Sequence, residues 1–387
     1  MLFRSILNKE TPEDNENNNR YTRANSFLQE SLANGTLLKD NESALYEYIQ
    51  KFEHPLNPQQ IVERRTLFVA LKLEPYEKGV VLPHEETHPK AKADRLLLMK
   101  ATQANPEPIY GLYEDPNLEI AKLLDSARGD SEPFLKAVYA GETAEDAEQH
   151  LIYRHNNPEI IRKIQALFEP KRVWIADGHH RYETALNYQK ENPKADALLI
   201  GLSAFEDKGL VVLPTHRMVK NVSASRMLEL PLQLERYFHL RVLSIEEGRA
   251  WIKQEVVGEK RFVIILPQKA YALTLRDIGI MEKASEGDHC QAWRHLDVSI
   301  LQFLVLDRSL GISWQALAHT PDVAYTRDEE EAVQKVANGE FQLSCMLQNP
   351  TVTEVRDVAS AGDKMPQKST FFYPKLWSGL ILRFVGE

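Results

Sequence analysis

The residues with the clearest chemical potential form one run, Asp177–Arg181, which reads Asp-Gly-His-His-Arg. The run follows the short apolar stretch Val173–Ala176, which is typical of a buried strand, and precedes the helix-like segment 182–188. A helix that begins there presents free N–H groups and the positive end of its dipole, and both favour an anion. The sequence therefore predicts an anion site where a strand passes into a helix.

Each residue of this run has a chemical use. Arg181 offers a planar fork that suits phosphate or carboxylate, and Gly178 lets the backbone approach a ligand closely. His179 and His180 donate or relay protons near neutral pH, and Asp177 accepts a hydroxyl proton or holds a metal. The alternative is structural: the aspartate caps the helix, Arg181 pairs with Glu183 or another acid, and the histidines are half-exposed turn residues.

A second polar stretch, His84-Glu85-Glu86-Thr87-His88, matches H-E-x-x-H, the pattern of zinc peptidases. Pro83 precedes the stretch and Pro89 follows it, which disfavours the continuous helix that such a zinc site requires. We expect instead a polar loop ahead of a helix that begins near Pro89. In that loop His84, Glu85 and Thr87 either reach into a cleft or lie at the surface, with Thr87 or His88 as helix cap.

A third polar box is the segment 213–217, Leu-Pro-Thr-His-Arg, where an apolar strand is expected to end in Thr215, His216 and Arg217. Because strand ends gather at one edge of a sheet, this box could meet the first run. The rival interpretation is a structural hydrogen-bond cluster.

The fourth box is the segment 365–375, in which Lys368, Ser369, Thr370 and Lys375 resemble a phosphate or carboxylate clamp. The segment lacks the Gly-rich loop of a P-loop. The alternative is a solvated turn followed by a C-terminal strand.

Composition limits the possible classes of protein. A formal net charge of -9 and a pI near 5.8 argue against bulk nucleic-acid binding, which needs a concentrated basic face. The two cysteines, Cys290 and Cys345, are too few for a disulfide framework or a four-cysteine zinc site. With no signal peptide or membrane span in the pattern, we expect a cytoplasmic protein with no membrane partner.

The polar boxes must be positioned by a mixture of strands and helices, so we predict an α+β fold with mixed sheets. Residues 1–20 are polar and Asn-rich and are expected to form a flexible leader. An N-terminal α+β region is expected over 21–225, and a C-terminal one over 226–387. Strands are predicted at 44–52, 66–73, 134–139, 149–154, 173–176, 197–205, 210–213, 237–243, 261–266, 270–275 and 341–347. The first two are expected to form a hairpin or adjacent antiparallel strands. Helices are predicted at 22–33, 89–104, 117–126, 158–168, 182–188, 245–256, 296–308 and 328–337.

Taken together in this order, the four boxes resemble the bacterial and archaeal domain-of-unknown-function family one thousand and fifteen, from about residue 21 onward. The Asp-Gly-His-His-Arg run is also similar to the phosphate-binding box of the ParB, sulfiredoxin and free-serine-kinase fold, which implies a nucleotide-binding core around it. The chain departs from the family at its start, where members have a Pro-Pro-Tyr-Asp-like motif and this sequence has the Asn-rich leader. If the missing segment builds the pocket, the protein is inactive.

This resemblance and the local chemistry together predict a nucleotide-binding phosphotransferase that acts on a small hydroxyl-bearing metabolite such as serine, with ATP or ADP and Mg²⁺. Asp177 or Glu85 would be the acid or base, His180 is a third catalytic candidate, and His84, Thr87 and Thr215 would line the pocket. The nucleotide phosphates would contact Gly178, His179, Arg181, His216, Arg217, Lys368, Ser369, Thr370 and Lys375.

Two other classes of function remain open. One is a nucleotide-gated regulatory protein associated with DNA, as ParB is, although the negative net charge does not favour it. The other is a metal-dependent hydrolase that uses His84, His88 and the paired histidines.

Overall fold

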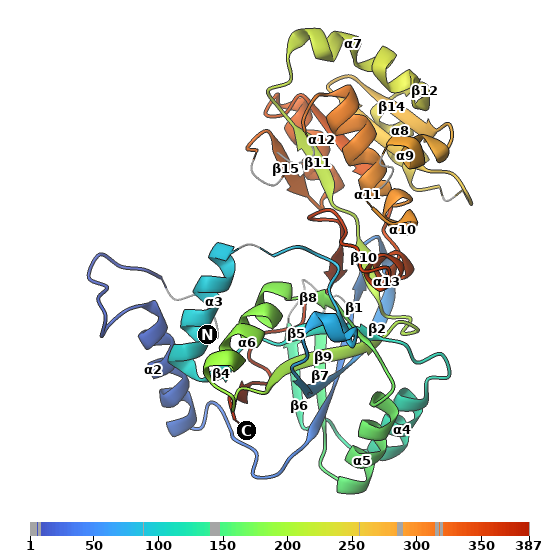
Figure 1. Ribbon diagram of the computed structural model, residues 1–387. Helices are drawn as coiled ribbons and strands as arrows, with labels where there is room; N and C mark the ends of the chain where they lie inside the picture. The colour runs from blue at the N-terminus through green and yellow to red at the C-terminus, as the bar shows by residue number, and fades with distance from the viewer. Residues whose placement is uncertain are drawn as a thin grey trace. The chain divides into compact units, whose positions relative to one another are not determined.

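The computed structural model describes residues 6, 9–87, 89–139, 148–254, 256–284, 289–313, 317 and 320–386 (Figure 1). The chain divides into two compact units. Unit 1 contains Met1–Val211 and Pro374–Glu387, and unit 2 contains Val212–Tyr373. The boundary expected near residue 225 therefore lies inside unit 2, and the C-terminal stretch returns to unit 1.

Unit 1 is built on one eight-stranded sheet with the strand order β3-β8-β5-β9-β2-β1-β7-β6. The sheet is mixed, because β3 pairs with β8 and β5 with β9 in parallel, whereas the other neighbours are antiparallel. Its strands are β1 (Leu45–His54), β2 (Asn57–Lys72), β3 (Val81–Leu82), β5 (Ile109–Tyr113), β6 (Leu135–Tyr139), β7 (Glu148–His155), β8 (Val173–Asp177) and β9 (Ala197–Ala204). A separate short pair joins β4 (Ala104–Asn105) and β18 (Arg383–Phe384).

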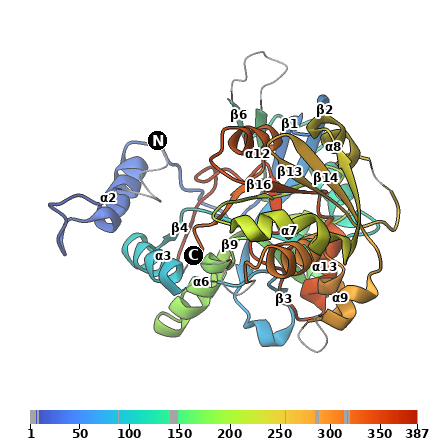
Figure 2. The same ribbon diagram turned by 90° about the horizontal axis from the view of Figure 1, so that it is seen from above.

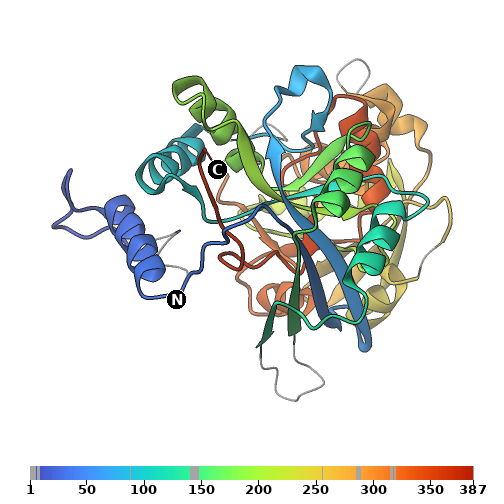
Figure 3. The same ribbon diagram turned by 90° about the horizontal axis from the view of Figure 1, so that it is seen from below.

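The helices of unit 1 are α2 (Arg20–Ala33), the 3₁₀ turn η1 (Tyr76–Lys78), α3 (Pro89–Thr102), α4 (Glu119–Arg128), α5 (Pro158–Phe168) and α6 (His179–Glu191). Helices α3 and α6 lie side by side, as do α4 and α5 (Figures 2 and 3). The core between sheet and helices contains Ile109, Ile175, Tyr182 and Ile200, all with almost no exposed surface. This burial fixes the end of β8 and the start of α6, where the polar run lies.

Unit 2 contains a six-stranded sheet with the order β12-β14-β13-β16-β11-β15 and a two-stranded pair, β10-β17. Its strands are β10 (Val211–Leu213), β11 (His216–Val219), β12 (Phe238–Leu243), β13 (Arg261–Leu266), β14 (Lys269–Leu275), β15 (Val323–Thr326), β16 (Leu343–Leu347) and β17 (Phe371–Tyr373). Its helices are α7 (Ala224–Glu235), α8 (Ile245–Ile252), α9 (Gly279–Ala284), α10 (Gln291–Arg294), α11 (Asp297–Ile300), the π-helix η2 (Leu301–Ser309), α12 (Glu329–Ala337) and α13 (Val352–Ser360).

The protein thus has the α+β fold with mixed sheets that the sequence predicted. The alternation of apolar residues correctly indicated the β1–β2 hairpin, and the helix beginning at Pro89 is confirmed. The patterns missed the helices α7, α9, α10 and α13. They also missed the strands β3, β4, β5, β11, β15 and β18, of which β5 lies next to β8 in the sheet of unit 1. Among the described residues, no helix combines the length and apolar character needed to cross a membrane.

Candidate functional site

The turn between β8 and α6 depends on Gly178, which has a left-handed backbone with φ of 96°. A Cβ atom at this position would lie 2.8 Å from Ile109 Cγ2 and 3.0 Å from Arg181 Nε. Both the backbone angle and the lack of space therefore require glycine. The strand passes directly into the helix as predicted, but α6 begins at His179, earlier than the apolar pattern indicated.

Asp177 holds two cations at this turn. Its Oδ1 accepts a hydrogen bond from Lys375 Nζ at 2.7 Å, and its Oδ2 accepts one from Arg181 at 2.8 Å. Burial alone would raise the pKa of the Asp177 carboxyl, but Lys375 and Arg181 outweigh it and hold that pKa below its ordinary value. The aspartate is therefore ionised at neutral pH. It is an ion-pair partner, and no side chain caps the helix.

The Arg181 guanidinium is fixed from three directions. Besides Asp177, it donates to the carbonyl oxygen of Pro108 at 2.6 Å and lies 3.4 Å from Glu107 Oε2. Its side chain is only 18% exposed. Its bonds to these acids support the structural alternative for this residue, and the role of Glu107 was not visible in the sequence because no short-range spacing links it to Arg181.

His84 and His179 contact each other in the interior of unit 1, with ring centroids 4.7 Å apart and the rings nearly perpendicular. The backbone N–H of His84 donates to His179 Nε2 at 3.2 Å, so this nitrogen is unprotonated. His84 Nδ1 lies 2.6 Å from the carbonyl oxygen of Ile175, which accepts a hydrogen bond only from a nitrogen that carries a proton. Burial lowers the pKa of His84, so its ring is neutral with the proton on Nδ1.

The remaining candidates of the first two boxes lie around this histidine pair. Glu85 Oε2 is 3.9 Å from His179 Nδ1, and its side chain is half-buried. His180 is half-buried in the first turn of α6, where its carbonyl oxygen accepts a hydrogen bond from Thr184 Oγ1 at 2.7 Å. The structure therefore brings the first box and the start of the second box together.

The loop ahead of α3 is attached to α6 by Glu183. This carboxylate accepts hydrogen bonds from Thr87 Oγ1 at 2.6 Å and from Lys92 Nζ at 2.8 Å. The described residues 83–87 form a loop rather than a helix, and His88 lies outside the described residues. Thr87 is thus a loop anchor, and the contribution of Lys92 and Glu183 was missed because a single sequence does not reveal that α3 and α6 are neighbours.

The third box lies between two strands: β10 ends at Leu213 as predicted, but His216 and Arg217 open the next strand, β11, instead of ending the first one. Arg217 is buried, donates to the carbonyl oxygens of Thr215 and Lys368, and lies over the Tyr325 ring at 5.7 Å. Burial lowers the pKa of Arg217 to about 10 and that of His216 to about 4. The sequence pattern missed β11 because this short strand begins with two polar residues and contains few apolar ones.

The fourth box is divided between the units. Lys368, Ser369 and Thr370 belong to unit 2, where Lys368 has a left-handed backbone with φ of 59° and Ser369 Oγ donates to the Pro366 carbonyl oxygen. Lys375 belongs to unit 1 and joins Asp177. The predicted clamp is therefore not one cluster within either unit: Arg217 gathers with Lys368, and Lys375 gathers with the first box.

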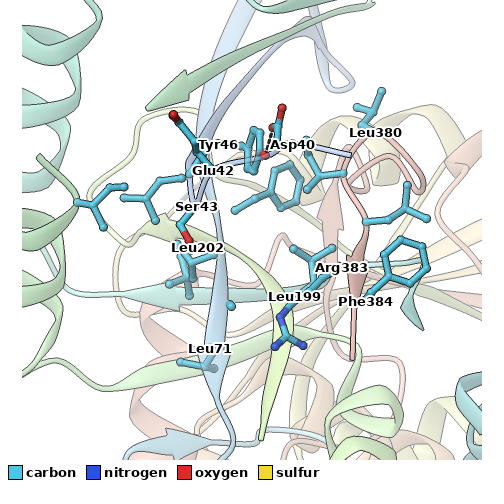
Figure 4. Close-up of a pocket in the computed structure, with 18 of the residues that line it drawn as sticks. Asp40, Glu42, Ser43, Tyr46, Leu71, Leu199, Leu202, Leu380, Arg383 and Phe384 are labelled. Atoms are coloured by element: carbon cyan, nitrogen blue, oxygen red, sulfur yellow. Dashed lines mark hydrogen bonds between the residues drawn. The ribbon is translucent and has the colours of Figure 1, made fainter. Parts of the chain in front are cut away.

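A cavity of about 1190 Å³ lies elsewhere in unit 1 (Figure 4). Its walls are mainly apolar and include Leu71, Leu199 and Leu202 from the sheet and Leu380 and Phe384 from the C-terminal stretch. None of the residues 177–181 lines it. This cavity and the polar run Asp177–Arg181 are therefore separate places in unit 1.

Within the described ranges, no group of three or more His, Cys, Asp or Glu side chains is arranged to hold a metal ion. The ring nitrogens of His84 and His179 discussed above are already used in hydrogen bonds to the backbone. A magnesium ion needs fewer protein ligands, because it is usually held by one or two carboxylates together with substrate phosphates. The two oxygens of Asp177 accept hydrogen bonds from Lys375 and Arg181 in this structure.

Comparison with known proteins assigns the chain to a family. The family model described as "Protein of unknown function (DUF1015)" matches residues 2–299. The chain belongs to the DUF1015 family. No curated protein matches it.

Three solved structures are similar to this DUF1015 member at low identity. A conserved hypothetical protein from Pyrococcus furiosus is 14% identical with a TM-score of 0.36, covering 81% of this chain and 93% of its own. A free serine kinase in complex with AMP is 14% identical with a TM-score of 0.37, covering 79% and 86%. A C-terminally truncated SbnI from Staphylococcus aureus is 10% identical with a TM-score of 0.40, covering 82% and 87%.

Proposed function

We propose that Asp177–Arg181 and Lys375 bind the phosphates of a nucleotide, and that the protein is a phosphotransferase for a small hydroxyl-bearing metabolite such as serine. The observation that carries the proposal is the placement of Lys375 and Arg181 on one carboxylate beside the N-terminus of α6. Two cations, a helix dipole and a glycine turn at one point form an environment that favours a polyanion.

Lys375 is the cation that phosphate would engage. Its side chain is 41% exposed, whereas that of Arg181 is 18% exposed and is bound to two acids and a carbonyl. A phosphate oxygen would take Lys375 as a hydrogen-bond partner in exchange for part of its contact with Asp177. Arg181 then contributes mainly by holding the turn and neutralising Asp177, and Gly178 keeps the backbone open to the ligand.

The acid and base of the reaction would come from the same cluster. Asp177 is ionised and accepts the proton of the acceptor hydroxyl, with Glu85 as the second carboxylate beside His179. His180 lies one residue further into α6 and is the third candidate. Mg²⁺ from the nucleotide complex would neutralise phosphate charge when bound, with Asp177 as its protein ligand.

Transfer to a hydroxyl compound tests the reaction directly. The purified protein is incubated with ATP or ADP, Mg²⁺ and each of a panel of hydroxyl compounds that begins with serine, and ³¹P NMR records new phosphate monoesters. A nucleotide-dependent monoester that disappears in Asp177→Asn supports the proposal. Nucleotide binding without transfer to any compound would support a regulatory protein instead.

Lys375→Gln tests the phosphate contact, and Lys190→Gln is its matched control, because Lys190 lies near the end of α6, away from the turn. A nucleotide at 100 times its dissociation constant adds about 2.7 kcal/mol to the free energy of unfolding, which raises the unfolding temperature by about 5–10 °C. We expect this rise in the wild type and in Lys190→Gln, and a much smaller one in Lys375→Gln. An equal rise in all three would exclude Lys375 from the phosphate site.

A further inference from the structure

Two fully buried polar side chains lie opposite each other in the β1–β2 hairpin of unit 1. Gln50 of β1 pairs in register with Arg64 of β2, and neither side chain has exposed surface. Arg64 donates a hydrogen bond to Gln50 Oε1. Burying a guanidinium costs free energy unless hydrogen bonds replace its lost hydration. The hydrogen-bond partners of Arg64 therefore indicate its structural role.

The partners of this pair are two successive backbone carbonyls of the C-terminal stretch. Arg64 donates to the carbonyl oxygen of Pro374 at 2.6 Å, and Gln50 Nε2 donates to that of Lys375 at 3.3 Å. These bonds join residues more than three hundred positions apart in sequence. The hairpin therefore holds the backbone at the residue whose side chain reaches Asp177.

Arg64 is also connected to Asp177 through Tyr110. The Arg64 guanidinium lies over the ring of Tyr110, 5.1 Å from its centroid. Tyr110 of β5 pairs in register with Asp177 of β8. Arg64 thus lies against Tyr110, the cross-strand neighbour of Asp177, while it binds the backbone carbonyl directly before Lys375.

We infer that Arg64, assisted by Gln50, is a positioning residue that fixes Lys375 for the phosphate contact at the turn. The inference deepens the proposed function and rests on it where nucleotide affinity is concerned. A lysine side chain loses considerable rotamer freedom when it is held in one geometry, so a fixed backbone reduces the ordering that remains. Arg64 itself does not touch the ligand.

The first measurement concerns the position of Lys375 and needs no nucleotide. Lysines are labelled with a low concentration of an acetylating reagent, and mass spectrometry compares the rate at Lys375 with that at exposed Lys163 as internal reference. We expect Arg64→Met and Gln50→Met to raise the Lys375 rate about fivefold, the ratio that corresponds to one ordinary hydrogen bond. An unchanged rate in both folded variants would overturn the inference.

Thr66→Val is the matched control for a loss of stability in the same strand. Thr66 is buried two positions along β2 from Arg64, and its Oγ1 lies 3.0 Å from Ser203 Oγ. The substitution removes one buried hydrogen bond, whereas the bonds to the Pro374 and Lys375 carbonyls come from Arg64 and Gln50. The labelling rate of Lys375 in Thr66→Val should equal that of the wild type. If it rose as much as in Arg64→Met, the increase would result from a general loss of stability, which would contradict the positioning role. Gln50→Met provides the second route if Arg64→Met fails to fold.

The second measurement is a double-mutant cycle on nucleotide affinity. If Arg64 acts through Lys375, Arg64→Met weakens binding in the wild type but has no further effect in a Lys375→Gln background. Independent, additive losses would contradict the inference. If labelling at Lys375 responds to Arg64 while the wild type binds no nucleotide, the positioning role stands and the proposed function fails.

Discussion

Replacement of Gly178 by alanine tests the strand-to-helix turn on which the site depends. The left-handed backbone costs an alanine about 1–2 kcal/mol. The new Cβ would also lie 2.8 Å from Ile109 Cγ2, and Ile109 has no exposed surface and cannot easily move away. Overpacking of this kind costs about 1–3 kcal/mol, so Gly178→Ala should lower the free energy of unfolding by about 2–5 kcal/mol in total.

Gly79→Ala separates the two contributions. Gly79 also has a left-handed backbone, with φ of 66°, but a Cβ there would meet no atom within 4 Å. Urea denaturation of both variants should therefore show a loss of about 1–2 kcal/mol for Gly79→Ala and a clearly larger loss for Gly178→Ala. Equal losses would refute the conclusion that Ile109 and Arg181 close the space around the turn.

Three further outcomes follow from the contacts. Burial lowers the pKa of His216 in the folded protein to about 4, below the value of 6.5 for the free side chain. The neutral ring therefore contributes its full stability above pH 6.5, and this contribution is lost as the pH falls toward 4. Urea denaturation at several pH values should show a weaker decrease in the free energy of unfolding for His216→Gln than for the wild type. Thr87→Val removes a hydrogen bond to Glu183 and should lower the free energy of unfolding by about 1 kcal/mol. Limited proteolysis should cut the loop before α3 faster in this variant, and an unchanged rate would contradict the anchor role of Thr87. A lysine at position 181 cannot make the contacts with Asp177, Glu107 and the Pro108 carbonyl at the same time. Arg181→Lys should therefore weaken nucleotide binding at least tenfold. Wild-type affinity by calorimetry would show that binding does not require the guanidinium.

Much of the fold was visible in the sequence because apolar periodicity is a local property. The buried run Val173–Ala176 predicted β8, and alternation over 44–52 and 66–73 predicted the β1–β2 hairpin. The start of α6 was set too late because its first turn is polar and shows no apolar stripe. The strand β11 was missed because His216 and Arg217 are polar residues at buried positions, which local propensity does not predict.

The composition of the polar centre was only partly predictable for a different reason. The run Asp177–Arg181 is contiguous, and its placement at a strand-to-helix turn followed from local pattern alone. The contact between Lys375 and Asp177 spans 198 residues and depends on the return of the chain to unit 1. The contact of Arg64 and Gln50 with the C-terminal carbonyls was not predicted, because Arg64 lies outside the predicted strand 66–73 and only the tertiary fold brings these carbonyls against the pair.

Calorimetric titration of ATP and ADP, each with Mg²⁺, into the wild type, Lys375→Gln and Lys190→Gln tests the central claim most directly. A charge-assisted hydrogen bond contributes about 1.5–3 kcal/mol, so loss of the Lys375 ammonium should weaken nucleotide binding by about 10- to 150-fold while Lys190→Gln retains wild-type affinity. Wild-type affinity in Lys375→Gln, or no heat of binding with any nucleotide in the wild type, would contradict a phosphate site at this turn.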